Sequence, residues 1–135
     1  MVTFNEGITV YNKRLDQETR LDKWNRTQIP EGCSWYGGQA VTVGESGLVT
    51  ADKYSVRILG SATVGYVTPD EWLSLTESEG LWTLQSGDVV VRGHVDRDVV
   101  SGITEITQAF SDCFIVTSVH DNRRIALQHI RIEGK

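Results

Sequence analysis

The feature that most constrains the fold is a strict alternation of apolar and polar residues. Tyr54, Val56 and Ile58 alternate with Ser55 and Arg57. Successive side chains of a β-strand point to opposite faces, so one face of this segment is expected in a core and the other in water. Short runs rich in Val, Ile, Thr, Trp and Tyr recur between Gly, Asn, Asp and Ser residues, which is typical of strands and turns. We therefore predict a mainly β fold, a small antiparallel β-barrel or sandwich.

Other strands are expected on both sides of this segment. Gly37 and Gly38 tolerate positive φ, which suits a hairpin or a bulge between two short strands. Residues 44–47 (GESG) form the next expected turn, and residues 103–108 fit either a strand or one helical turn. The expected strands lie at residues 7–13, 21–28, 33–38, 39–43, 48–59, 81–84, 89–95 and 113–132, the last as two strands around a turn.

One segment departs from the strand pattern. Thr68 precedes a proline at the first helical position, and Glu71 completes a Thr-x-x-Glu capping box. A polar stretch ending in a glycine follows. The sequence therefore predicts one short helix at about residues 68–76, with Trp72 and Leu75 on its buried side.

Length and composition fit one folded domain. A chain of 135 residues with 39% hydrophobic and 23% charged residues is expected to form one domain spanning 1–135. Residues 12–23 and 59–80 are polar and long for connections inside a β domain, so we expect them to be loops. The net charge of -5 lacks the basic footprint of phosphate-backbone binding. Specific nucleic-acid binding is not expected.

The first residues lack the pattern of a secretory signal, and no apolar run approaches the length of a membrane span. No membrane partner is expected, and the protein is expected in the cytoplasm. Cys33 and Cys113 lie far apart and form no CxxC pair. In a reducing compartment, buried free thiols are favoured over a disulfide.

The sharpest metal hypothesis concerns residues 94–98 (HVDRD). If a strand continued through them, His94, Asp96 and Asp98 would lie on one side, and His120 could complete a metal site. The alternative is a solvated strand end, since the segment follows a glycine and no HExxH or clustered Cys/His pattern accompanies it. We favour the alternative and expect no metal. A metal-assisted enzyme or ligand-binding domain using these four residues remains the second functional hypothesis.

The remaining patterns give little support to catalysis. The sequence has no G-x-S-x-G elbow, no cysteine in a recognisable nucleophile context and no phosphate-binding glycine motif. We expect no cofactor and no enzymatic activity. Four tryptophans could form a stacking platform, but in a small barrel they more often fill the core. They are Trp24, Trp35, Trp72 and Trp82.

The C-terminal stretch 118–132 gathers histidines, an aspartate and arginines, which at first suggests an active site. Alternation on either side of residues 120–124 (HDNRR) instead predicts a hairpin turn. Arg123 and Arg124 would be exposed there and could face a carboxylate of a neighbouring subunit. Arg20 and Lys23, in the first polar segment, are the other candidate protein contacts.

Four stretches carry a family resemblance that spans nearly the whole chain. The sequence resembles a family of small, uncharacterised proteins of tailed phages and prophages of Gram-positive bacteria. The stretches are ITVYNKRLDQETRLDKWNRTQI (8–29), SWYGGQAVTVGESGLVTADKYSVRI (34–58), WTLQSGDVVVRG (82–93) and VTSVHDNRRIALQHIRI (116–132).

The resemblance implies a role in virion assembly and assigns no functional residue. Genes of this kind lie among those for head–tail joining, and similar small β proteins include head-closure subunits, β-barrels with a long mobile loop. The first hypothesis is therefore a head–tail connector subunit, either head-closure or neck. It would contact portal-side and tail-side proteins, form a ring on assembly in the host cytoplasm, and end in the virion neck.

Overall fold

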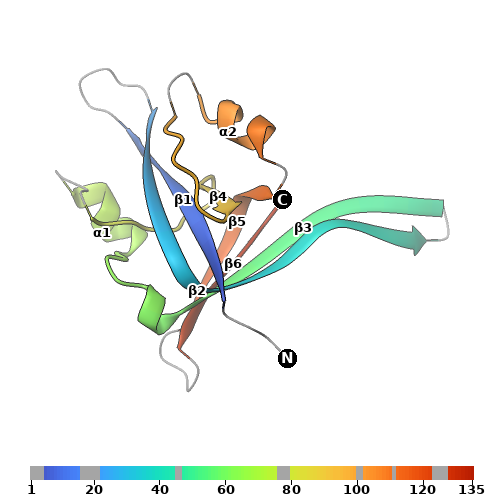
Figure 1. The fold of residues 1–135 in the computed structure, drawn as a ribbon, viewed down its shortest axis with the longest axis horizontal. Coiled ribbons are helices and arrows are strands. Elements are labelled where there is room, and N and C mark those ends of the chain that lie inside the picture. Colours follow the sequence, from blue (N-terminus) through green and yellow to red (C-terminus); the bar gives the residue numbers. More distant parts are fainter. Residues whose placement is uncertain are drawn as a thin grey trace.

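The computed structural model describes residues 5–15, 22–44, 47–75, 80–99, 102–110, 112–122 and 128–135. Its strands close into one antiparallel barrel in the order β1-β2-β3-β6-β5-β4 (Figure 1). The mainly β prediction is confirmed, and of barrel and sandwich the barrel is correct. The strands are β1 (Glu6–Leu15), β2 (Asp22–Gly44), β3 (Gly47–Leu59), β4 (Val89–Arg92), β5 (Cys113–Asn122) and β6 (His129–Gly134).

The polar segment 12–23 is less of a loop than its composition suggests. β1 and β2 pair without interruption from Ile8↔Ile29 to Leu15↔Asp22. Both ends of the segment are therefore strand, because backbone hydrogen bonding between neighbours outweighs the weak strand propensity of charged residues. Residues 16–21 lie outside the described residues.

β2 continues through the two glycines where the sequence suggested a hairpin or a bulge. Gly37 and Gly38 pair with Tyr54 and Lys53, in a register that runs unbroken to Gly44↔Gly47. The expected turn at residues 44–47 is where β2 ends and β3 begins. The one long strand β2 thus replaces the two short strands predicted at 33–38 and 39–43, and it forms a long hairpin with β3.

The barrel interior holds the larger of two apolar clusters. Val56 and Ile58 are fully buried there, as the alternation around Val56 predicts, and Ile130 and Ile132 of β6 are fully buried beside them. β5 behaves likewise, with Phe114 buried and Ile115 exposed. The other buried members of this cluster are Ile8, Val10, Ile29, Cys33, Tyr54, Trp82, Leu84, Val90 and Val116.

A second cluster lies where helix α2 (Thr104–Ala109) packs on the outside of the barrel. It contains Val89 and Val91, whereas Val90 belongs to the interior cluster. The three valines are thus buried on both faces of β4, as their uninterrupted apolar run predicts. The second cluster is completed by Tyr11, Val95 and Ile106.

The predicted helix is present as α1 (Pro69–Ser74). The Thr68 hydroxyl accepts from the Glu71 backbone N–H at 3.3 Å and donates to the Glu71 carboxylate at 3.1 Å. Trp72 is buried, its indole N–H donates to the Lys13 carbonyl, and the Arg14 guanidinium lies 5.7 Å from its ring centre. α1 is therefore fixed against the end of β1.

The segment 59–80 is ordered around a tryptophan where the structure describes it. A 3-10 turn, Gly60–Ala62, follows β3, and the Trp82 indole N–H donates to the Val64 carbonyl at 2.8 Å. A β-carbon on Gly65, which has φ of +83°, would lie 2.5 Å from the Gly80 carbonyl oxygen. Close backbone contact explains a glycine there.

None of the helices in the described ranges is long and apolar enough to cross a membrane.

The cysteines and tryptophans follow the sequence interpretation in most respects. Both thiols are free; Cys33 is buried, and Cys113 is half-buried rather than buried. Trp72 and Trp82 are 1% exposed. The half-buried Trp35 and Trp24 pack against the interior and the second cluster, respectively.

Candidate functional site

The residues of the metal hypothesis follow β4 and face an arginine. Arg26 on β2 places its guanidinium 3.1 Å from the Asp98 carboxylate and 3.6 Å from that of Asp96. His94 Nε2 lies 2.8 Å from the same Asp96 oxygen and 3.2 Å from the Gln28 amide. These contacts lower the pKa of Asp96, chiefly through the His94 hydrogen bond. The two carboxylates thus already have a cationic partner.

His120 lies on a different strand pair. It is opposite Arg131 in the β5–β6 ladder and does not join the residues after β4 in any larger cluster. In the part of the chain that the structure describes, no group of three or more His, Cys, Asp or Glu side chains is placed to hold a metal.

Of the four candidate protein contacts, one is described. Lys23 lies near the start of β2, opposite Arg14, and its side chain is exposed. Arg20, Arg123 and Arg124 lie outside the described residues.

A buried polar network that sequence reasoning missed joins β1 to the segment before β4. Asn12 Nδ2 donates to the Asp88 carboxylate at 2.9 Å and to the Thr83 carbonyl at 2.6 Å. The same carboxylate accepts from the backbone N–H groups of Lys13 and Gln85. Burial raises the pKa of Asp88 to about 6, against the lowering effect of these hydrogen bonds. The network ties β1 to the irregular segment before β4, which is a structural role.

The most unusual element is the part of the β2–β3 hairpin beyond the barrel, residues 37–53, called the arm below. Figure 1 shows it projecting well clear of the other strands. β1 pairs with β2 only as far as Cys33, and β6 pairs with β3 only from Tyr54 onward. Among the described residues, the arm strands therefore pair only with each other.

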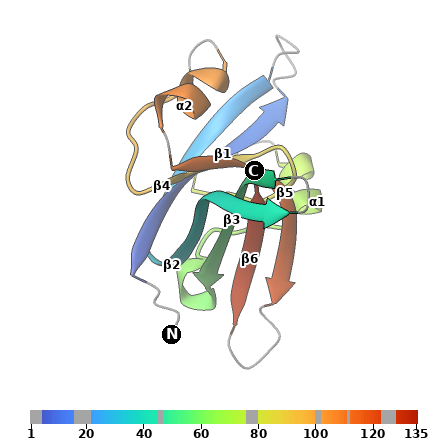
Figure 2. The same cartoon turned by 90° about the vertical axis from the view of Figure 1, so that its right-hand side faces the viewer.

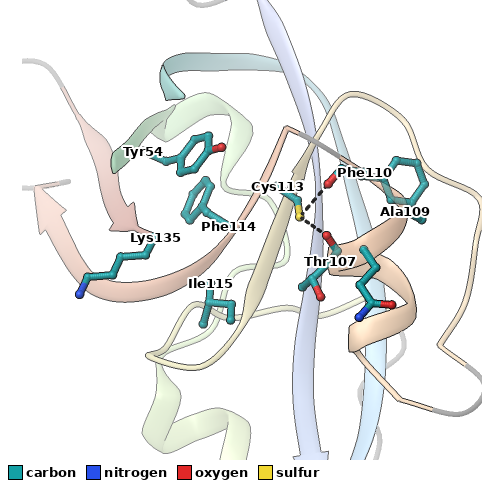
Figure 3. Close-up of a pocket in the computed structure, with 9 residues that line it drawn as sticks. Tyr54, Thr107, Ala109, Phe110, Cys113, Phe114, Ile115 and Lys135 are labelled. Carbon is teal, nitrogen blue, oxygen red and sulfur yellow. Dashed lines mark hydrogen bonds between the residues drawn. The ribbon is translucent and has the colours of Figure 1, made fainter. Parts of the chain in front are cut away.

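A cleft of about 540 Å³ opens at the base of the arm, between α2, β5 and the C-terminal end of β6 (Figure 3). Figure 2 shows how these elements are arranged in the fold. Tyr54, the first β3 residue after the arm, is part of its wall, and Lys135 supplies the one charged side chain of the lining. The other lining residues are Thr107, Gln108, Ala109, Phe110, Cys113, Phe114 and Ile115.

Aromatic rings form one side of the cleft. Tyr54 and Phe114, both labelled in Figure 3, stack with ring centres 5.3 Å apart and planes 11° apart. The Trp35 ring packs against both, with its centre 5.7 Å from that of Tyr54 and 5.4 Å from that of Phe114. A β-carbon on Gly134 would meet the Phe114 ring at 2.2 Å, so a glycine is needed where β6 passes it. The wall is thus held by packing on three strands.

The thiol in the cleft is not activated. Cys113 Sγ lies 3.3 Å from the Phe110 carbonyl and 3.7 Å from the Thr107 carbonyl, both hydrogen-bond acceptors (Figure 3). Burial, aided by the nearby Asp112 carboxylate, raises the pKa of Cys113. Because the thiolate is the nucleophile, this environment disfavours thiol chemistry. The cleft lining combines aromatic and aliphatic side chains with the polar groups of Thr107 and Gln108 and the Lys135 ammonium group.

Fold and site together define a class: a closed six-stranded antiparallel β-barrel with a projecting two-stranded arm and a cleft of mixed polar and apolar lining at the arm's base. The chain belongs to a family of unknown function, DUF6751, which matches residues 2–135. Comparison with curated proteins found no match, and comparison with solved structures found none either.

Proposed function

We propose that the protein is a structural subunit of phage or prophage virion assembly, a head–tail connector of the head-closure or neck type that acts by protein–protein contact. The observation that carries this proposal is the arm. A two-stranded ribbon that extends beyond its own barrel adds little to the core, so its value lies in contact with a neighbour.

The backbone of the arm supplies the means of contact. The outward-facing N–H and C=O groups of an unpaired strand edge form a ready template for a strand of another chain. Within the described residues, β3 has such an edge from Gly47 to Lys53. Natural proteins usually cover or shorten such edges. A long exposed edge is therefore best explained by a partner that pairs with it.

The sequence resemblance supplies the context for that partner. It points to small β proteins that join heads to tails, placed between portal-side and tail-side proteins of the virion neck. An acidic subunit suits such a channel, because its net charge of -5 repels a passing genome.

The geometry favours this proposal over a metal-assisted enzyme. Asp96 and Asp98, which would have to bind the cation, share the Arg26 guanidinium. The cleft thiol of Cys113 has a raised pKa rather than a lowered one. Neither feature favours a catalytic site.

Deletion of the gene from the phage or prophage that carries it tests the proposal. Electron microscopy of the lysate is expected to show unattached tails beside heads that have lost their DNA, and re-expression of the protein should restore joined particles. Infectious particles of normal appearance and number from the deletion strain would refute a connector role.

A further inference from the structure

We infer that the outer face of the barrel over β3, β6 and β5 is a docking surface for an acidic segment of a partner protein. Its basic strip consists of Arg57, Arg131 and His120, one residue on each of the three strands. The inference rests on the proposed function and deepens it, because it names the chemistry by which an assembly partner is recognised. It uses the barrel and no residue of the arm.

The strip follows from the register of the sheet. Arg131 lies directly opposite Arg57 on one side and His120 on the other, and Figure 2 shows β3, β6 and β5 side by side. Residues directly opposite in an antiparallel pair point to the same face, with their β-carbons about 5 Å apart. Val56 and Ile132, which precede and follow these arginines in the chain, are buried in the interior. Alternation therefore places the strip on the outside.

The two arginines of the strip are poorly partnered. Like charges directly opposite in a sheet destabilise it, and the Arg57 side chain has no ion pair or hydrogen bond with any residue that the structure describes. Arg131 has an ion pair with Glu133 at 3.5 Å, which is longer than a strong charge-assisted hydrogen bond. Its Nε–H is buried, and no acceptor in the described ranges reaches it. Carboxylates from another chain would supply the missing acceptors.

An exposed aromatic side chain lies beside the strip. Tyr36 on β2 is 78% exposed and stands opposite Ser55, two residues before Arg57 on the same face of β3. His120 is exposed as well, and the Arg131 side chain is 36% exposed. Tyrosine and arginine are enriched among the residues that dominate binding energy in protein interfaces. The surface is thus open and has the composition of a protein contact.

The size of the strip favours a protein partner over a nucleic acid. Three strands about 4.8 Å apart make it roughly 10 Å wide, which accommodates two or three carboxylates, whereas a nucleic-acid backbone requires a longer basic track. Guanidinium groups bind carboxylates through two parallel hydrogen bonds. The net charge of -5 also opposes the approach of a long polyanion. A short acidic segment that places an apolar side chain on Tyr36 is therefore the occupant.

The test measures peptide binding to the full-length protein by fluorescence anisotropy. The probe is a labelled peptide of Glu-Glu-Tyr repeats, which presents carboxylates and rings to one face in any extended register. Arg57→Glu reverses a charge of the strip, and its control is Arg97→Glu, the same charge change at an exposed arginine beyond β4. Tyr36→Ser removes the aromatic contact without a change of charge, and Leu73→Ser, at an exposed leucine of α1, is its control.

We expect the unmodified protein and both controls to bind the peptide reversibly. Arg57→Glu should bind it about tenfold or more weakly, and Tyr36→Ser a few-fold more weakly. A single-stranded oligothymidylate of equal length, which offers phosphates in place of carboxylates, should bind about tenfold or more weakly than the peptide. Absence of peptide binding, an equal loss in the controls, or a preference for oligothymidylate would overturn the inference.

Urea unfolding separates loss of a contact from loss of the fold. In Arg57→Glu, a carboxylate directly opposite Arg131 replaces a like-charge pair with an opposite-charge pair, so the urea midpoint of unfolding should rise. Weaker peptide binding by a more stable protein would support the docking surface. A lower midpoint would give Arg57 a structural role and count against the inference.

Failure of this inference is distinguishable from failure of the proposed function. A deletion strain that leaves tails unattached, with a protein that binds no acidic peptide, would keep the connector role and remove the docking surface. Peptide binding that Arg57→Glu abolishes, with normal particles from the deletion strain, would keep the docking surface and remove the connector role.

Discussion

At the scale of single residues, the most informative group is the buried carboxyl of Asp88. It is fully buried, yet three N–H groups donate to it, from the Asn12 side chain and from the backbone of Lys13 and Gln85. Desolvation outweighs these donors and raises its pKa to about 6 from an ordinary 3.8. The native state therefore holds this proton more tightly than the unfolded chain does.

Asp88 should make stability depend on pH in a defined direction. Between about pH 4 and pH 6 the native state binds more protons than the unfolded state, so the free energy of unfolding should fall as pH rises through this window, by at most about 3 kcal/mol. Urea unfolding of the unmodified protein and of Asp88→Asn measures it. As pH rises through that window, the free energy of unfolding of the unmodified protein should fall relative to that of Asp88→Asn. A difference between the two free energies that does not change with pH would contradict the assignment.

At the scale of elements, local patterns predict what is locally determined. The alternation around Val56, the apolar run at Val90 and the capping box of Thr68 all lead to the elements that form. The sequence is ambiguous at the second helix, α2, because residues 103–108 fit both the strand and the helix period. Packing of α2 against β4 selects the helix. The pairing of Arg26 with Asp96 and Asp98 joins distant segments, and no local pattern contains it.

α2 forms one wall of the cleft, and Ile106 fixes it to the barrel. This side chain is fully buried in the cluster with Val89 and Val91. Ile106→Ala should lower the free energy of unfolding by about 2–5 kcal/mol and loosen α2, seen as faster amide hydrogen exchange in the helix. Thr104→Ala, at an exposed position of the same helix, is the control. An equal effect of both substitutions would argue against this role of Ile106.

At the scale of the whole molecule, the barrel is a closed sheet and the arm extends two of its strands. Among the residues that the structure describes, the barrel sheet is closed, and a long unpaired strand edge lies in the arm. The sequence predicted a barrel or sandwich, but not the arm, because Gly37 and Gly38 read as a break. Continuous pairing through those glycines depends on hydrogen bonds to the partner strand β3. The conformational preference of the glycines themselves carries no information about that strand. The cleft was missed for the same reason, since its lining comes from three distant segments.

The central claim is that the arm performs assembly, and complementation of the deletion strain tests it most directly. In an arm-shortened variant, an Asn-Gly turn joins the paired residues Gln39 and Asp52 in place of residues 40–51; its control is Leu73→Glu, at an exposed leucine of α1. Each variant would be expressed in that strain, and the fraction of heads joined to tails would be counted by electron microscopy. Leu73→Glu should restore joined particles, whereas the arm-shortened variant, folded and present at the same level, should leave heads and tails apart. Joined particles with the arm-shortened variant would contradict the account.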